Sequence, residues 1–131
     1  MDPRTSYRVV AAQGASPVGL VVQLYEQMIQ DLVRAVQALQ HNNTERRTRE
    51  INHALTVLGC LQGTLDMRRG GNVAGDLWRF YTSVRARLLE AQGSASRQLL
   101  EEQISCLLEV RQAWVEVERE AAGNSPPMFT Q

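Results

Sequence analysis

A break near the middle of the chain constrains its fold more than any other feature. The apolar residues over 58–65 recur every three or four positions, and the same interval returns over 73–84, which predicts a helix on each side. Between these stretches, Arg68-Arg69 places positive charge where a helix C-terminus favours it, and Gly70-Gly71 can adopt the positive φ that ends a helix. Asn72 is suited to the next N-cap. A break this short makes the flanking helices antiparallel, so the chain is expected to be two helical hairpins joined here.

Start and stop signals along the sequence predict four helices. Ser16-Pro17 is a strong start, because the serine can accept from an orphan N–H and proline at the first helical position has no donor to lose. The polar residues His41-Asn42-Asn43 end the first helix, Thr44 can cap the second, and Gly93-Ser94-Ala95-Ser96 separates the third from the fourth. The predicted helices cover residues 17–40, 44–68, 73–92 and 96–122.

The predicted helices differ in the width of their apolar faces. On projection the apolar arc spans about 180° in the first helix, about 160° in the second and about 100° in the third. The first helix is therefore expected to be the most buried. The second carries more apolar surface than one core contact uses, which indicates either a partner groove or ordinary burial between two neighbouring helices. Trp78 and Leu89 share a second face of the third helix, available to a neighbouring helix or a partner.

Length and composition agree with a single helical domain. A chain of 131 residues with 44% hydrophobic and 21% charged residues is typical of a globular protein with one core. The predicted fold class is all-α, an antiparallel up-down four-helix bundle with an N-terminal arm. The expected boundaries are 1–15 for the arm, 16–122 for the bundle and 123–131 for a disordered tail.

Charge and targeting features favour a cytoplasmic protein that binds neither nucleic acid nor membranes. The formal net charge is zero, and the arginines over 46–49 are offset by Glu45 and Glu50, so no basic patch for RNA is indicated. All 14 basic residues are arginine, which indicates either genome composition bias or arginine-mediated partner recognition. No apolar run is long enough to insert into a membrane, and the N-terminus lacks a signal peptide, so a cytoplasmic location is expected. Cys60 and Cys106 are interpreted as small core or groove residues rather than a disulfide.

The sequence contains no recognisable catalytic or metal-binding pattern. His41 and His53 lack a ligand spacing with another histidine, a cysteine or an acid, and His53 is interpreted as a solvated helix residue. The glutamate runs lack the Glu-x-x-His pattern of a di-metal bundle, and Gly70-Gly71 does not follow a strand as a phosphate loop would. The chain is therefore expected to be neither an enzyme nor a protein that uses a metal or cofactor.

An ordered set of short motifs runs through residues 7–114. The motifs are Ala15-Ser16-Pro17 with Leu20, Leu24-Tyr25, Leu65-Asp66 leading into Gly70-Gly71, Leu77 with Tyr81, Arg87-Leu88 with Ala91, and Ala113-Trp114. In this order and spacing the chain resembles the FliS family of flagellar export chaperones, which are antiparallel four-helix bundles. Two departures are Thr82-Ser83-Val84, where the family often has Asp-Tyr-Met, and Glu26, where aspartate is frequent. Under this resemblance, the departures are expected to bear on which flagellin is bound rather than on the fold.

The resemblance implies a specific function. It implies a cytoplasmic chaperone that binds the C-terminal disordered segment of flagellin, prevents its premature polymerisation and supports its secretion by the flagellar type III apparatus. Export-gate or regulatory flagellar proteins are then further candidate partners. The alternative is a small helical adaptor or regulator that shares the bundle and binds another protein.

In the family, the client segment becomes helical on binding, which requires an apolar groove to offset the entropy lost in ordering. The apolar arcs of the second and fourth helices are the predicted walls of this groove. The candidate flagellin-binding residues are Ile51, Ala54, Leu55, Val57, Leu61, Thr64, Leu100, Ile104, Leu107 and Leu108. Tyr7, Val9 and Val10 are the sizeable apolar residues of the arm, and the resemblance places the arm near the groove. The arm is therefore predicted to be a cover that the client displaces, with a frayed terminus as the alternative.

Overall fold

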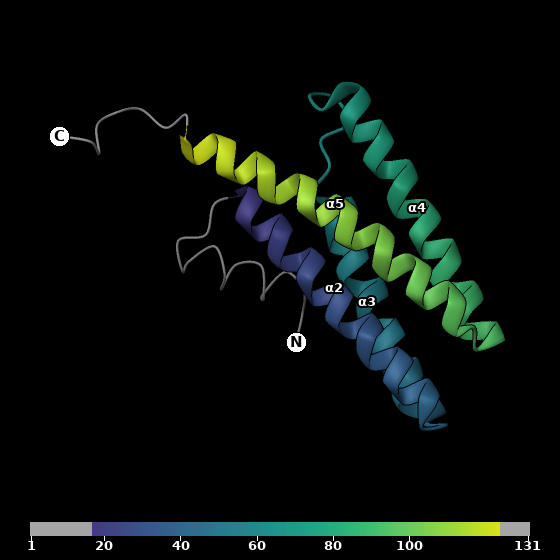
Figure 1. The fold of residues 1–131 in the computed structure, drawn as a ribbon. Helices are drawn as coiled ribbons and strands as arrows, with labels where there is room; N and C mark the ends of the chain where they lie inside the picture. Colours follow the sequence, from purple (N-terminus) through teal and green to yellow (C-terminus); the bar gives the residue numbers. More distant parts are fainter. Residues whose placement is uncertain (1–16, 124–131) are drawn as a thin grey trace.

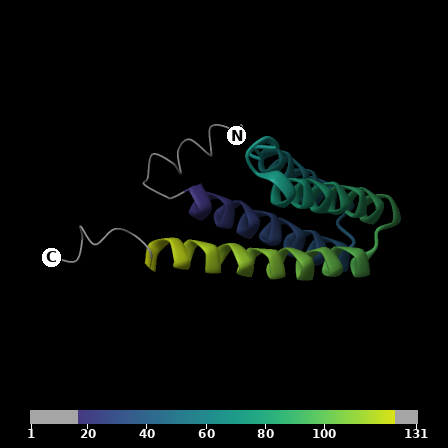
Figure 2. The same cartoon turned by 90° about the horizontal axis from the view of Figure 1, so that it is seen from above.

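The computed structural model describes residues 17–123, and they form the predicted antiparallel four-helix bundle (Figures 1 and 2). The helices are α2 (Pro17–Gln40), α3 (Thr44–Gly63), α4 (Gly71–Ser94) and α5 (Arg97–Gly123). Within the described residues every regular element is a helix, so the all-α prediction is confirmed. The predicted arm and tail lie outside the described residues, apart from Gly123, which ends α5.

The four helices form a closed ring in cross-section. Helix α2 packs against α3 and α5, and α4 packs against the same two helices from the opposite corner. The contacts of α2 are more extensive than those of α4. No close backbone approach joins α2 to α4 or α3 to α5 among the described residues, so these pairs occupy the diagonals. Figure 2 shows α2 beside α5, with α4 on the other side of the bundle.

The core runs along the centre of this ring. All four helices contribute fully buried leucines: Leu32, Leu58, Leu88, Leu100 and Leu107 are examples. Burying one such side chain contributes roughly 1.5–3 kcal/mol. Helix α2 has more buried residues than any other described helix, as its wide apolar arc predicted.

The α3–α4 connection begins earlier than the sequence predicted. Helix α3 ends at Gly63 instead of residue 68, and Asp66 Oδ1 then accepts the backbone N–H groups of Arg68 and Arg69, each at 3.1 Å. Helix α4 starts at Gly71, whose φ is +53°, and its N-cap is Gly70 rather than Asn72. A Cβ on Gly70 would lie 2.5 Å from the Ala74 Cβ, so the turn requires glycine at both positions.

The remaining caps are partly as predicted. Asn43 rather than Thr44 caps α3, because its side chain accepts the Arg46 N–H at 3.0 Å. At the last turn, Ser96 accepts the Leu99 N–H at 3.1 Å, as predicted for a serine there. Helix α4 continues through Ser94, so this turn consists of Ala95 and Ser96 only.

Of the described helices, none is long and apolar enough to span a membrane.

Candidate functional site

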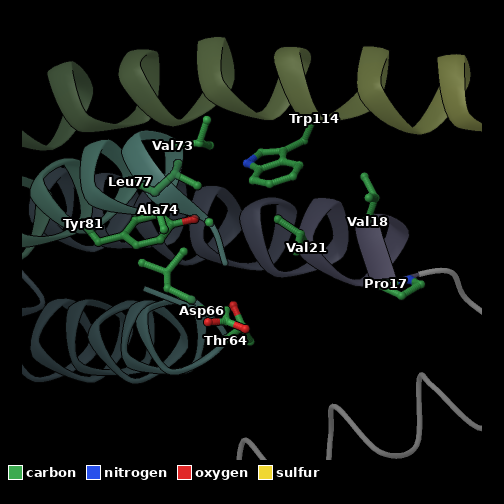
Figure 3. Close-up of a pocket in the computed structure, with 12 residues that line it drawn as sticks. Pro17, Val18, Val21, Thr64, Asp66, Val73, Ala74, Leu77, Tyr81 and Trp114 are labelled. Carbon is green, nitrogen blue, oxygen red and sulfur yellow. The ribbon is translucent and has the colours of Figure 1, made fainter. Parts of the chain in front are cut away.

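An apolar pocket of about 340 Å³ opens at the end of the bundle where α2 begins and α5 ends. We call it the open-end pocket (Figure 3). Its walls come from the first turns of α2, the α3–α4 connection, the first three turns of α4 and one residue of α5. The lining residues are Pro17, Val18, Val21, Thr64, Leu65, Asp66, Gly70, Val73, Ala74, Leu77, Tyr81 and Trp114.

The pocket is open because the helices are staggered at this end. Figure 2 shows the last turns of α5 running past the start of α4. Helix α4 therefore does not cover the adjoining faces of α2 and α5, and Val18, Val21 and Trp114 remain only partly buried. Val73, in the first turn of α4, is 65% exposed. The result is a concave apolar surface with one open side, a form typical of sites that receive a partner side chain or helix.

The floor of the pocket is formed by Tyr81, which is hydrogen-bonded from behind by a second buried tyrosine, Tyr25. Tyr25 on α2 donates its hydroxyl hydrogen to the Tyr81 hydroxyl on α4 at 2.9 Å, and both side chains are almost fully buried. The two rings are tilted at 55°, with centroids 6.2 Å apart. This hydrogen bond crosses the diagonal of the bundle, between two helices whose backbones do not approach closely.

The pKa values of the tyrosines show that charge is disfavoured at this floor. Burial raises the pKa of Tyr25 above its ordinary value of 10.0, and the neighbouring Tyr81 hydroxyl and Trp114 indole offset part of the rise. Burial also raises the pKa of Tyr81, and the proximity of Tyr25 raises it further. Both hydroxyls are therefore protonated at neutral pH, and since Tyr25 donates to Tyr81, one O–H of the pair remains available to another acceptor.

Three further polar groups distinguish opposite sides of the pocket. On α5, Trp114 Nε1 is buried and has no acceptor in good hydrogen-bonding geometry among residues 17–123. At the other side, the α3–α4 connection contributes the Thr64 hydroxyl and the Asp66 carboxylate. Figure 3 shows Thr64 and Asp66 across the pocket from Trp114, with Val21 between them.

The structure does not gather the ten predicted groove residues on one surface. Leu55 and Ile104 are partly buried, and Thr64 and Leu108 are exposed. Thr64 is the member of the set that lines the open-end pocket. The residues enclosed in the bundle, at 5% exposure or less, are Ile51, Ala54, Val57, Leu61, Leu100 and Leu107. A role for the ten residues in client binding stays a prediction.

The wide apolar face of α3 has a simpler explanation than a partner groove. Helix α3 lies between α2 and α4, and both neighbours bury part of its arc. Of the two interpretations left open for this arc, burial between two neighbouring helices describes its main apolar residues, because a helix at a corner of the bundle faces two partners. Tyr7, Val9 and Val10 lie outside the described residues.

Several single-residue interpretations are also changed by the structure. His53 is half exposed, but its Nδ1 lies 2.6 Å from Oδ2 of Asp31, a carboxylate that is only 1% exposed in the α2 face. The sequence analysis missed Asp31, although its position inside the apolar arc of the first helix was a usable signal.

Cys60 is partly buried and Cys106 is exposed, so Cys106 is not a core residue. Trp78 and Leu89 are about half exposed. No cluster of three potential metal ligands occurs within residues 17–123.

The motifs of the sequence analysis converge on the open-end pocket. Seven of their residues line it: Pro17, Leu65, Asp66, Gly70, Leu77, Tyr81 and Trp114. Tyr25 belongs to another motif and bonds to the floor. Pattern reasoning identified these residues as motifs but did not bring them together in a pocket, because periodicity shows which face is apolar and not where a helix stops covering its neighbour.

Comparisons with known proteins agree with this set of motifs. The family model described as "Flagellar protein FliS" matches residues 1–121. The flagellar secretion chaperone FliSB of Pseudomonas aeruginosa is 35% identical over 100 residues, which cover 76% of this chain and 79% of the relative. The flagellar secretion chaperone FliS of Salmonella typhimurium is 27% identical over 113 residues, covering 86% and 84%. That of Vibrio cholerae is 26% identical over 103 residues, covering 79% and 76%. With a family match over nearly its whole length and a bundle of the expected form, this chain belongs to the FliS family.

Proposed function

We propose that this protein is a cytoplasmic flagellar export chaperone that binds the C-terminal segment of flagellin. By holding that segment, it prevents premature polymerisation and keeps flagellin available to the flagellar type III secretion apparatus. The observation that carries the proposal is the convergence of the family motifs on the open-end pocket, which is apolar, concave and exposed. Export-gate proteins and regulatory flagellar proteins are further candidate partners.

The shape and chemistry of the pocket support capture of an amphipathic helix. A disordered segment that folds on binding must bury apolar side chains to offset the entropy it loses. Val18, Val73 and Leu77 provide an apolar surface that no other described element covers fully. One or two large apolar residues of a client helix can enter this surface, and the rest of the helix can continue along the exposed faces beside it.

The N-terminal arm is part of the proposal. Residues 1–15 join the bundle at Pro17, which itself lines the pocket. Tyr7, Val9 and Val10 are therefore within a short chain length of the pocket. We assign the arm the role of a cover that shields the apolar lining until flagellin displaces it.

The proposal is tested by titration calorimetry of the full chain with a C-terminal flagellin peptide from the same organism. We expect Val73→Glu to weaken binding at least tenfold, because it places a charge at the pocket mouth. The matched control is Leu89→Glu on the same helix, at a residue that is 56% exposed and outside the pocket. Both sites are exposed, so each substitution should change stability by less than about 0.5 kcal/mol.

The same titration, together with dye binding, tests the proposed role of the arm. A chain lacking residues 1–14 should associate faster with the peptide and bind more of a hydrophobic dye. If the wild-type protein does not bind the peptide, the chaperone assignment is wrong. If Val73→Glu and Leu89→Glu bind equally well, the client does not use this pocket.

A further inference from the structure

The floor of the open-end pocket contains more hydrogen-bond donors than internal acceptors. Two hydroxyls that bond to each other use one of their two hydrogens, so the Tyr25–Tyr81 pair retains one O–H whichever way it is oriented. Trp114 adds an indole N–H, which can only donate, and its Nε1 is buried. Even if this N–H turned toward the Tyr25 hydroxyl beside it, one tyrosine O–H would still lack an acceptor among the described residues.

The Tyr81 and Trp114 side chains that carry these donors lie at the inner wall of the pocket. Figure 3 shows Tyr81 extending from α4 into the pocket and the Trp114 indole entering from α5. Both residues belong to the pocket lining. Buried donors without acceptors are costly, so a ligand that supplies an acceptor here gains a hydrogen bond and removes an existing penalty.

The other side of the pocket presents acceptors. The Thr64 hydroxyl donates to the Leu61 carbonyl oxygen at 2.7 Å, so its own lone pairs remain available. Asp66 Oδ1 holds the N–H groups of Arg68 and Arg69, and Oδ2 lies 3.8 Å from Arg69 Nε. Donors at the floor, acceptors at the mouth and apolar walls between them complement a side chain that carries both kinds of group on an apolar stem.

We propose that the open-end pocket recognises a carboxamide, a glutamine or asparagine on the apolar face of the client helix. The amide oxygen accepts from the Tyr81 hydroxyl, and the amide NH₂ donates to Thr64 or Asp66. This inference rests on the proposed function, because it specifies the client residue that enters the pocket. It makes the site selective for one side-chain chemistry rather than for apolar area alone.

Competing side chains fit this site less well. A carboxylate would face Asp66 at the mouth and would enter a floor where burial already disfavours charge on the tyrosines. An aliphatic side chain would leave the floor donors without acceptors. A site built to bond a polar group rejects analogues that lack that group, because its own polar atoms then stay unpaired.

The test combines variants on both sides of the interface. The full chain carries Tyr81→Phe, and the flagellin C-terminal peptide carries each glutamine in turn as methionine and each asparagine in turn as leucine. We expect Tyr81→Phe to weaken binding of the unmodified peptide about tenfold. We expect one modified peptide to bind wild type about tenfold more weakly and to lose nothing further with Tyr81→Phe.

The control is Tyr25→Phe, which breaks the same buried tyrosine pair but keeps the Tyr81 hydroxyl at the pocket. It should bind the unmodified peptide with at least the wild-type affinity. The carboxamide assignment is overturned if Tyr81→Phe binds normally, if its loss is the same for every peptide, or if the bound segment contains no glutamine or asparagine. A wild-type protein that binds no flagellin peptide at all would instead reject the proposed function, so the two failures are distinguishable.

Discussion

Removing the His53 side chain should destabilise the bundle although the residue is half exposed, because it is a partner of a buried carboxylate. Asp31 is buried on α2, where Oδ2 lies 2.6 Å from His53 Nδ1 and Oδ1 accepts from Gln27 Nε2 at 3.0 Å. Arg34 is 3.8 Å from Oδ1 and is itself 43% exposed. In the His53→Ala variant, the Asp31 carboxylate would keep the neutral hydrogen bond from Gln27. Its other remaining partner would be the more distant, solvent-exposed Arg34 guanidinium.

The magnitude follows from these remaining partners. Removing one member of a fully buried ion pair costs about 3–5 kcal/mol. Here Gln27 and Arg34 remain and the histidine is half exposed, so we expect a loss of about 2 kcal/mol, nearer the cost of one unsatisfied buried acceptor. For a domain of this size, that loss lowers the melting temperature by roughly 8 °C.

The assay is urea and thermal unfolding followed by circular dichroism, with Asn52→Ala as the control at the adjacent exposed position. Asp31→Asn should cost less than His53→Ala, because an amide tolerates burial better than a carboxylate. The double variant should then lose less than the sum of the two single changes. A His53→Ala protein within about 0.5 kcal/mol of wild type would show that the buried carboxylate does not need this partner.

Two further predictions concern the core and the tyrosine pair. Ala54 is fully buried, so Ala54→Glu should lower the free energy of unfolding by about 3 kcal/mol or more, as measured by thermal melts. If Ala54 instead contacts flagellin, as the sequence analysis predicted, the melting temperature should stay within a few degrees of wild type while the affinity for the flagellin peptide falls. Because burial raises the pKa of both tyrosines above 10.0, the folded state retains phenolic protons that the unfolded chain releases. The free energy of unfolding should therefore be steady below about pH 9 and decrease as the pH rises through 10, in urea titrations over this range; an equal decrease in a protein lacking both hydroxyls would contradict this cause.

Local signals in the sequence were sufficient for the helices but not for the site. Ser16-Pro17 and the turn at Ser96 give two boundaries correctly, because capping depends on neighbouring residues only. The premature end of α3 depends on the Asp66 side chain folding back onto the connection, and Gly70 permits its close approach to Ala74. Periodicity alone does not report such contacts.

The other features that the sequence did not reveal have the same physical origin. Whether the apolar arc of α3 forms a groove or a core contact depends on how many helices surround it, which a projection of one helix does not show. The His53–Asp31 pair joins residues 22 positions apart on different helices. The open-end pocket arises from the relative lengths and stagger of α4 and α5, so its residues could be recognised as a motif set before their common location was known.

Helices α2 and α4 are packed unequally, so they should differ in how easily each can be displaced from the bundle. Helix α2, held between α3 and α5, joins them into a three-helix unit that retains its most extensive contacts when α4 is displaced. Helix α4 has the least extensive packing of the four helices, so moving it outward would break the fewest contacts. Such a motion would separate the Tyr25 and Tyr81 hydroxyls and widen the open-end pocket. On the proposed function, the tyrosine hydrogen bond would act as a latch across the bundle, and weakening it should let α4 move outward more readily around a bulky client segment.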